Sequence, residues 1–206
     1  KYMTIKNNSL IKGTYYPPGD KSISHRILIL ASQTVGKSEI SNLLEGEDVI
    51  NTLRAMKIFG ANISKKKNKY IVFGVPPGGL FQPNKPIDFG NSGTGIRLIC
   101  GLIASNNIKA KLIGDESLSK RPMKRVTVHL KKIGAVINLR KDSYPPIQIQ
   151  GDGGAIPLKY NIMIPSAQIK SAIMLSALNT KGLIEIKEFK TTRDHTENML
   201  KAMGYN

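Results

Sequence analysis

The sequence predicts an α/β fold built from three similar units, the third of which is incomplete. Three amphipathic segments each end in a glycine at the position expected for a helix cap, namely Gly60, Gly134 and Gly204. These glycines lie 74 and 70 residues apart, and Ser22 precedes Gly60 by the same 38 positions that separate Ser166 from Gly204. A β-branched strand and a more apolar helix precede each amphipathic segment, so the order of elements repeats as well.

Each unit is expected to open with an apolar helix that begins with small polar residues. These helices are SISHRILILASQ (22–33), NSGTGIRLICGLIA (91–104) and SAQIKSAIMLSAL (166–178). A strand follows in each unit, at 37–43, 108–114 and 182–189. The amphipathic helical patterns lie within 48–63, 123–137 and 195–206, and each is closed by its glycine two or three residues before the end of that range. Closing strands are expected at 69–75 for the first unit, and at 145–150 with 160–164 for the second.

This pattern predicts a layered domain in which the apolar helices fill the centre and the strands form outer sheets. The third unit reaches Asn206 without the closing strands that the other two have, which indicates a piece of a longer protein.

The charge of the chain favours an anionic partner. The 206 residues include 31 Lys and Arg against 14 Asp and Glu, a formal net charge of +17. A nucleic acid, an anionic surface or small acidic substrates would all suit this charge. A nucleic-acid-binding domain would more often place aromatic residues among its basic ones, but aromatics make up 6% of the chain and Trp is missing.

Other chemistry is not indicated by the composition. Cys100 lies inside the apolar run IRLICGLIA and is expected to be a buried thiol, not a nucleophile. The three histidines lack metal-ligand spacing, so neither a metal site nor a cofactor is expected. No stretch is long and apolar enough for a membrane helix, and a cytoplasmic location is expected.

The starts of the three apolar helices carry the candidate binding residues. Free backbone N–H groups and the positive end of the helix dipole attract anions, and serines can equally serve there as ordinary N-caps. The polar residues at these starts are Lys21, Ser22, Asn91, Ser92, Gly93, Thr94, Ser166 and Gln168. Arginines close to predicted helix starts are Arg26, Arg121 and Arg193. If the three starts face one cleft, they would form a site for phosphorylated or carboxylated ligands.

Six motifs in this order resemble the 5-enolpyruvylshikimate-3-phosphate (EPSP) synthase family, and its class II bacterial branch most closely. They are PGDKSISHR, LLEGEDVINT, DFGNSGTGIRL, GDESLSKRPM, PSAQIKSA and TTRDHTENML, and they cover nearly the whole chain. The resemblance implies repeated βαβαββ units in a pseudo-threefold arrangement, in a monomeric enzyme of about twice this length with two domains. Residues 1–16 would contribute a strand that packs with the absent C-terminal domain. Residues 17–206 would be the N-terminal domain, with units at about 17–80, 81–160 and 161–206.

The resemblance also implies a reaction and a set of site residues. The family transfers the enolpyruvyl group of phosphoenolpyruvate to the 5-hydroxyl of shikimate 3-phosphate and releases phosphate, and it is the target of glyphosate. Lys21 would be catalytic and would lie between both substrates. The shikimate-3-phosphate set would be Lys21, Ser22, Arg26, Ser166, Ala167, Gln168 and Arg193. The phosphoenolpyruvate set would be Lys21, Asn91, Gly93, Arg121 and Gln168. Since the family's catalytic aspartate lies in the other domain, this chain alone should bind shikimate 3-phosphate weakly without turnover.

Two alternatives remain open from the sequence. The sister enolpyruvyl transferase that acts on UDP-N-acetylglucosamine shares the fold and the chemistry, but its usual KNA start is absent, and here KSISHR stands in that place. A basic nucleic-acid-binding domain is favoured by the net charge alone, and it predicts binding that falls steeply with salt.

Overall fold

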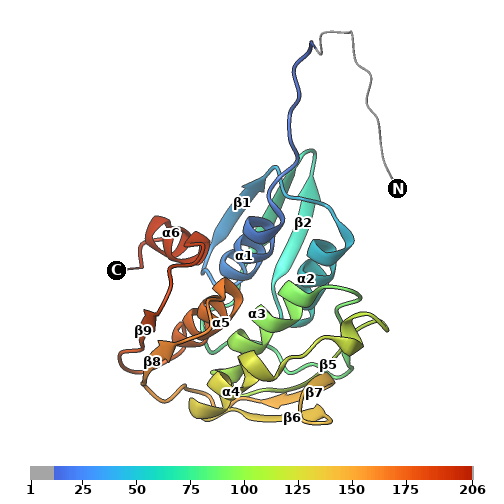
Figure 1. Cartoon of the computed structure of the whole chain (residues 1–206). Coiled ribbons are helices and arrows are strands. Elements are labelled where there is room, and N and C mark those ends of the chain that lie inside the picture. Colours follow the sequence, from blue (N-terminus) through green and yellow to red (C-terminus); the bar gives the residue numbers. More distant parts are fainter. Residues whose placement is uncertain (1–11, 206) are drawn as a thin grey trace, which may run out of the picture.

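A computed structural model describes residues 12–205, in which three sheets surround a central group of helices (Figure 1). The helices are α1 (Lys21–Ala31), α2 (Glu47–Ile58), α3 (Gly93–Ala104), α4 (Lys124–Lys132), α5 (Ala167–Ala177) and α6 (His195–Ala202), with one 3-10 turn, η1 (Leu118–Lys120). The strands are β1 (Lys37–Ser41), β2 (Asn62–Lys66), β3 (Lys69–Phe73), β4 (Ile87–Asp88), β5 (Lys109–Ile113), β6 (Val136–Arg140), β7 (Tyr144–Gln150), β8 (Lys159–Ile162) and β9 (Glu185–Glu188). The α/β class and the six helices agree with the sequence prediction.

Each sheet is built from strands that are close together in the chain, and the structure adds three strands that the sequence did not predict, β2, β4 and β6. Strands β1, β3 and β2 form an antiparallel sheet, and β4, β5, β7 and β6 form a second sheet in which β4 and β5 are parallel. The segment 160–164 was expected to close the second unit, and this is wrong. Strand β8 pairs in parallel with β9 instead, with Tyr160 opposite Ile186. Helix α5 connects β8 to β9 as α3 connects β4 to β5, because parallel neighbours need such a crossover.

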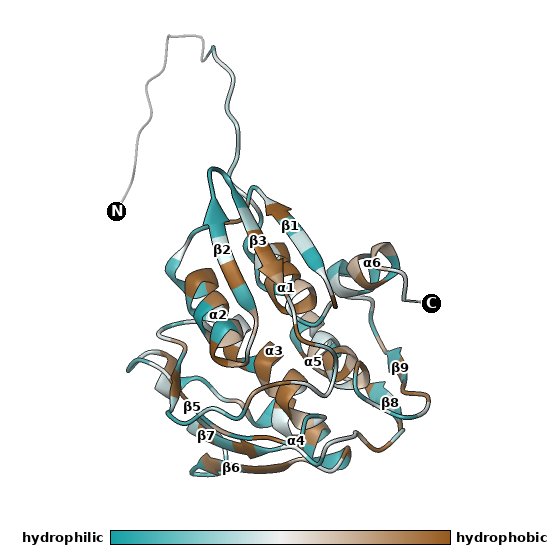
Figure 2. Cartoon of the chain, turned by 180° about the vertical axis from the view of Figure 1, so that it is seen from behind, coloured by the Kyte–Doolittle hydropathy of each residue, from teal (hydrophilic) through white to brown (hydrophobic). Residues whose placement is uncertain are grey.

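The apolar helices fill the centre, as predicted. Eleven of the twelve residues of α3 are buried, so the rest of the protein surrounds this mostly apolar helix on all sides (Figure 2). Helix α5 packs directly against it. At Gly101 the two helices come so close that a Cβ atom would lie 2.1 Å from the carbonyl oxygen of Ala172. Cys100 is buried in the same helix, and burial raises the pKa of its thiol to about 12. The thiol is therefore a packing group.

The three predicted cap glycines end α2, α4 and α6. Gly60, Gly134 and Gly204 have φ values of +104°, +107° and +88°, which is the left-handed region that glycine adopts without strain. Beside Gly60, the N–H of Ala61 donates to the carbonyl of Met56 at 3.0 Å, which satisfies a carbonyl that the helix end leaves free. The glycines therefore fix where each amphipathic helix stops.

Some predictions about domain organisation stay predictions. The strand expected within 1–16 lies mostly outside the described residues, and 12–20 carry no regular secondary structure. The same holds for the unit boundaries at 17–80, 81–160 and 161–206 and for the pseudo-threefold arrangement. Within residues 12–205, none of the helices has both the length and the apolar character that a membrane crossing would require.

Candidate active site

Helix α1 begins in a way that the sequence only partly predicts. Asp20, not Ser22, is its N-cap, and its carboxylate accepts a hydrogen bond from the N–H of Ile23 at 2.8 Å. Ser22 lies in the first turn, where its hydroxyl is 3.5 Å from a guanidinium nitrogen of Arg193. Because Asp20 supplies the cap, the hydroxyl of Ser22 is not needed for that purpose and faces the arginine.

The starts of α3 and α5 lie against each other. Ser92 and Ser166 are their N-caps, and each hydroxyl accepts a bond from the N–H three residues later, at 3.2 Å and 3.4 Å. The side-chain amide of Gln168 donates to the hydroxyl of Thr94 at 3.1 Å, which joins the two helix starts. Ala167 is the first residue of α5, so its N–H belongs to the group that an α-helix leaves without an intrahelical acceptor.

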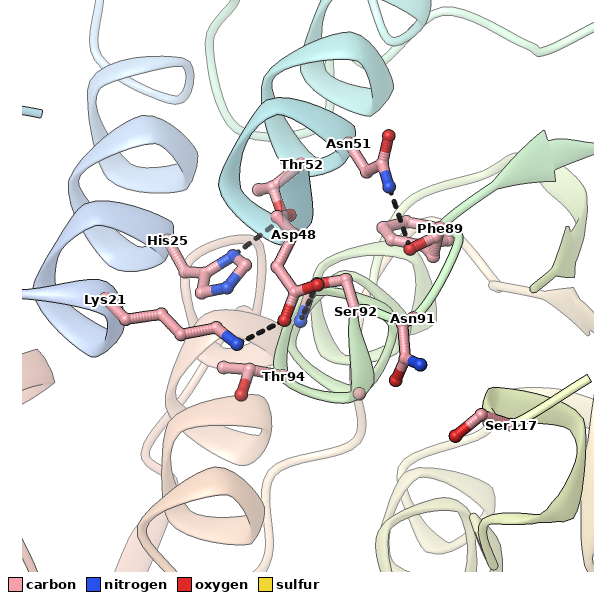
Figure 3. Close-up of polar contacts among 12 residues, drawn as sticks. Lys21, His25, Asp48, Asn51, Thr52, Phe89, Asn91, Ser92, Thr94 and Ser117 are labelled. Atoms are coloured by element: carbon pink, nitrogen blue, oxygen red, sulfur yellow. Dashed lines mark hydrogen bonds and ion pairs between the residues drawn. The ribbon is translucent and has the colours of Figure 1, made fainter. Parts of the chain in front are cut away.

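Lys21 connects the start of α1 to that of α2. Its ammonium forms an ion pair with Asp48 in the first turn of α2, and Figure 3 shows this pair next to Ser92 and Thr94 at the start of α3. Just over half of the Lys21 side chain is exposed, so the ammonium lies at the surface of the site. Asp48 was not among the predicted site residues, although it belongs to the motif LLEGEDVINT. Its position at the start of a predicted helix was the sequence signal that could have identified it as a site residue.

Arg121 reaches the start of α3 from the end of η1. Its guanidinium donates to the side-chain and backbone oxygens of Asn91 and to the hydroxyl of Ser117 at 3.3 Å. Gly93 lies below it, where a Cβ would be 3.0 Å from Arg121 Nη1 and 3.1 Å from Arg97 Nη1. A side chain at this position would therefore press on two guanidinium groups at once.

Arg97 is a member of this cluster that the sequence prediction missed. It is 6% exposed, and its guanidinium donates to the carbonyls of Gly93 and Pro122 and to the side-chain oxygen of Gln168 at 3.0 to 3.2 Å. Burial, followed by the nearby Arg125 and Arg121, lowers its pKa to about 10, so it stays charged at neutral pH. An arginine inside the apolar run IRLICGLIA, four residues after Gly93, was the signal that could have identified it.

Arg26 and Arg193 lie on the α1 side of the site, in different settings. Arg26 is buried, and its guanidinium donates to the hydroxyls of Thr196 and Ser171, both at 2.8 Å, and to the carbonyl of Ser22 at 2.9 Å. It therefore ties α1 to α5 and α6, with three of its five N–H groups engaged. Arg193 is exposed just before α6 and points at Ser22.

The cluster carries uncompensated positive charge. Among residues 12–205, none of the ion pairs involves Arg26, Arg97, Arg121 or Arg193, and only Lys21 has a carboxylate partner. Guanidinium groups without carboxylates, next to three helix N-termini, favour the binding of anions with several oxygen atoms. The described residues contain no group of His, Cys, Asp or Glu side chains suited to hold a metal ion. The guanidinium groups and helix starts of the cluster can bind anionic ligands and stabilise their charge.

His25 is a buried residue next to this site, between α1 and α2. It is fully buried, its Nδ1 lies 2.8 Å from the hydroxyl of Thr52, and its Nε2 has no hydrogen-bond partner within the described residues. Burial lowers the pKa of His25 to about 4, although the carboxylate of Asp48 opposes the shift. The imidazole is therefore neutral at physiological pH and serves as a packing group between α1 and α2.

We expect the stability of the chain to fall in mild acid because of His25. The unfolded chain takes up the proton near pH 6.5 and the folded chain only near pH 4. The stabilisation is therefore complete above pH 6.5 and is lost as the pH falls toward 4, by about 2 kcal/mol at pH 5. Urea unfolding at pH 7 and pH 5 measures this loss. The free energy of unfolding of the variant His25→Gln should fall clearly less between pH 7 and pH 5. An equal fall in both proteins would show that His25 does not cause the loss.

Comparison with known proteins agrees with this geometry. The family model of EPSP synthase (3-phosphoshikimate 1-carboxyvinyltransferase) matches residues 5–206. The chain is 47% identical over 203 residues to a 3-phosphoshikimate 1-carboxyvinyltransferase of Ruegeria sp. and 45% identical over 203 residues to that of Parvibaculum lavamentivorans. Each alignment covers 98% of this chain and 45% of the relative, so the chain spans about half the length of the curated relatives it matches.

A solved structure has the same fold. The EPSP synthase of Acinetobacter baumannii superposes with a TM-score of 0.89 at 38% sequence identity, over 94% of this chain and 44% of that one. Six motifs in order, the fold and the match along almost the entire chain lead to one conclusion: the chain belongs to the EPSP synthase family.

Proposed function

We propose that this chain supplies one half of an enzyme that transfers the enolpyruvyl group of phosphoenolpyruvate to the 5-hydroxyl of shikimate 3-phosphate, with release of phosphate. The other half would be a complementary C-terminal domain like the part of the relatives that lies outside the match. The observation that carries this proposal is the group of arginines without carboxylate partners at the starts of α1, α3 and α5. We call the two halves together the complete enzyme.

The positions of the residues suggest two neighbouring subsites. On the α1 and α5 side, we assign Ser22, Arg26, Ser166, Ala167, Gln168 and Arg193 to shikimate 3-phosphate. On the α3 side, we assign Asn91, Gly93 and Arg121 to phosphoenolpyruvate, with Gln168 at the boundary because it bonds both Thr94 and Arg97. Lys21 lies between the two groups and is proposed to contact both substrates and to be catalytic.

Electrostatics explains why such a site would need this much positive charge. Both substrates are anions, and bringing them within reaction distance costs Coulomb repulsion that rises as water is excluded. Fixed guanidinium groups and helix N-termini offset this repulsion without rearranging during the reaction. Lys21 would exchange its ion pair with Asp48 for contacts with the substrates, so that Asp48 holds the ammonium in place until they bind.

A ligand-dependent change in melting temperature tests the proposal. Shikimate 3-phosphate should raise the melting temperature of the complete enzyme, and to a smaller extent that of this chain alone, because stabilisation grows with the logarithm of ligand concentration over Kd. A steady-state assay with both substrates should show turnover by the complete enzyme and none by the chain alone. Failure of shikimate 3-phosphate to stabilise either form would refute the assignment. Tight binding of DNA or RNA that falls steeply with salt would instead favour a nucleic-acid-binding protein.

Gly93 leads to a prediction about the inhibitor glyphosate. We propose that the complete enzyme is glyphosate-sensitive and that Gly93→Ala weakens inhibition. The added methyl would lie 3.0 Å from Arg121 Nη1 and 3.1 Å from Arg97 Nη1, so both side chains must shift by a few tenths of an ångström into the phosphoenolpyruvate subsite. An overpacking cost of about 1–3 kcal/mol in the inhibited complex corresponds to a rise of about 5- to 150-fold in the inhibition constant.

Inhibition constants for glyphosate, measured against phosphoenolpyruvate for both forms, check this prediction. The KM for phosphoenolpyruvate is the control, because it reports whether the methyl discriminates between substrate and inhibitor. Equal inhibition constants for the two forms would contradict it. The cytoplasmic location stays a prediction from the sequence, and the monomeric state of the complete enzyme stays a prediction from the family resemblance.

A further inference from the structure

A second charged cluster lies beside the site, on the face of α5 that points toward β9 and α6. Lys170 follows Gln168 by two residues, but its side chain is 6% exposed and takes no part in the arginine cluster. Its ammonium contacts the carboxylate of Glu188 at 2.7 Å and that of Glu197 at 2.5 Å. A lysine buried to this degree needs partners, because leaving an ammonium without them in the interior is strongly unfavourable.

The two partners of Lys170 stand on either side of one loop. Glu188 is the last residue of β9, and Glu197 lies in the first turn of α6. Residues 189–194 connect β9 to α6, and five of these six residues are exposed. The exception is Thr192, whose hydroxyl donates to the second oxygen of Glu188 at 2.5 Å. The loop is therefore held at its two ends and at Thr192, and Lys170 contacts the residues that hold it.

This loop carries Arg193. The guanidinium of Arg193 lies 3.5 Å from the hydroxyl of Ser22, and this contact links the loop to the start of α1. The next helix is fixed to α5 by a further contact, because the hydroxyls of Ser171 and Thr196 lie 2.8 Å apart. Two adjacent residues of α5, Lys170 and Ser171, thus contact both the end of β9 and the first turn of α6, the two elements that the Arg193 loop connects.

The charges in the cluster support a fixed geometry. Burial tends to lower the pKa of Lys170, but its hydrogen bonds to Glu188 and Glu197 outweigh this effect and raise the pKa above the ordinary value. Burial likewise tends to raise the pKa of Glu188, and the bonds from Lys170 and Thr192 lower it overall. Lys170 and Glu188 therefore keep their ionic forms at neutral pH.

We infer that Lys170 is a positioning residue: it clamps both ends of the 189–194 loop and thereby places Arg193 where an anionic substrate binds against α1. The inference rests on the proposed function for the identity of that substrate, shikimate 3-phosphate. Lys170 itself does not contact the substrate. Its contribution is to lower the freedom of an exposed loop, so that less ordering is required when the substrate binds.

A double-mutant cycle in the complete enzyme tests the inference. Lys170→Met should raise the KM for shikimate 3-phosphate about tenfold, within the range of couplings found inside one ion-pair network, and change kcat less. In an enzyme that already carries Arg193→Ala, Lys170→Met should raise the KM for shikimate 3-phosphate little further, because Lys170 acts through Arg193. Lys170→Arg, which keeps the cation, should restore part of the loss. Lys159→Met, which removes an exposed ion pair with Glu185 on the neighbouring strands, is the matched control and should change nothing.

A second variant and a proteolysis measurement test the same inference independently. Glu188→Gln releases the β9 end of the loop while the pair between Lys170 and Glu197 remains, so it covers the case in which Lys170→Met does not fold. Trypsin should cut after Lys190 faster in Lys170→Met and Glu188→Gln than in the Lys159→Met control, because the loop opens more often.

The inference would be overturned if Lys170→Met raised the KM equally with and without Arg193. It would also be overturned if Lys170→Met changed neither the KM nor the rate of trypsin cleavage. If the wild-type enzyme does not respond to shikimate 3-phosphate, the proposed function has failed. The rate of cleavage after Lys190 then decides by itself whether Lys170 clamps the loop.

Discussion

Replacing Lys21 by Met is expected to lower kcat/KM of the complete enzyme by about 10²–10³-fold, the size found when one preorganised donor to developing charge is removed. Lys21 is the cation placed between the two proposed subsites, next to Thr94 and paired with Asp48 (Figure 3). The loss should appear in kcat, because charge that develops during the reaction would no longer be neutralised.

The fold should survive this change. The Lys21 side chain is 52% exposed, and removing a surface ion pair alters the free energy of unfolding by about 1 kcal/mol or less. Lys37→Met is the matched control: Lys37 has the same 52% exposure and pairs with Glu39, but it lies on β1 outside the arginine cluster. The control should keep full activity. If Lys21→Met retained a tenth or more of the wild-type kcat, Lys21 would not be the catalytic residue.

Replacing Gly101 by Ala is expected to destabilise the fold strongly, although it adds a single methyl group. The added Cβ would lie 2.1 Å from the carbonyl oxygen of Ala172 and 2.6 Å from its Cα, and these are backbone atoms of a buried helix that cannot turn aside. Helices α3 and α5 would have to separate, and with them the starts that hold Thr94 and Gln168. The better helix propensity of Ala offsets only about 1 kcal/mol.

We therefore expect a net loss at or above the upper end of the about 1–3 kcal/mol that overpacking costs, and a chain that is largely unfolded or insoluble at 37 °C. Urea unfolding of the wild type and the variant measures the loss. Gly46→Ala is the control, because a Cβ there would meet only the Leu44 side chain at 3.8 Å. That change should stay within about 1 kcal/mol. A Gly101→Ala chain as stable as the wild type would show that α3 and α5 do not pack this closely.

Much of the fold could be predicted from the sequence because the signals are local. Hydrophobic periodicity and the glycines at Gly60, Gly134 and Gly204 depend on residues within one or two turns, and they located all six helices. The polar starts of the apolar helices and the ordered motifs identified the family and the candidate site residues by the same kind of short-range signal.

Other features could not be predicted in this way. Segment 160–164 reads as a strand, but its partner β9 follows only after the intervening helix α5. Asp20 and Ser22 are both acceptable caps, and the local chain path selected Asp20. Arg97 resembles a lone charge in an apolar helix until Gln168 and the carbonyl of Pro122 are brought to its guanidinium.

By itself, the sequence determined which segments are helices, most of the strands, where the amphipathic helices end, and to which family the chain belongs; it did not indicate β2, β4 or β6. The tertiary structure decided which strands pair, which arginines remain without a carboxylate, and that Lys170 contacts carboxylates on both sides of the Arg193 loop. The physical reason is the separation along the chain over which each interaction acts: periodicity and capping act between neighbouring residues. Pairing and charge compensation depend on groups such as Arg26 and Thr196, which are 170 positions apart and meet only after the helices have packed.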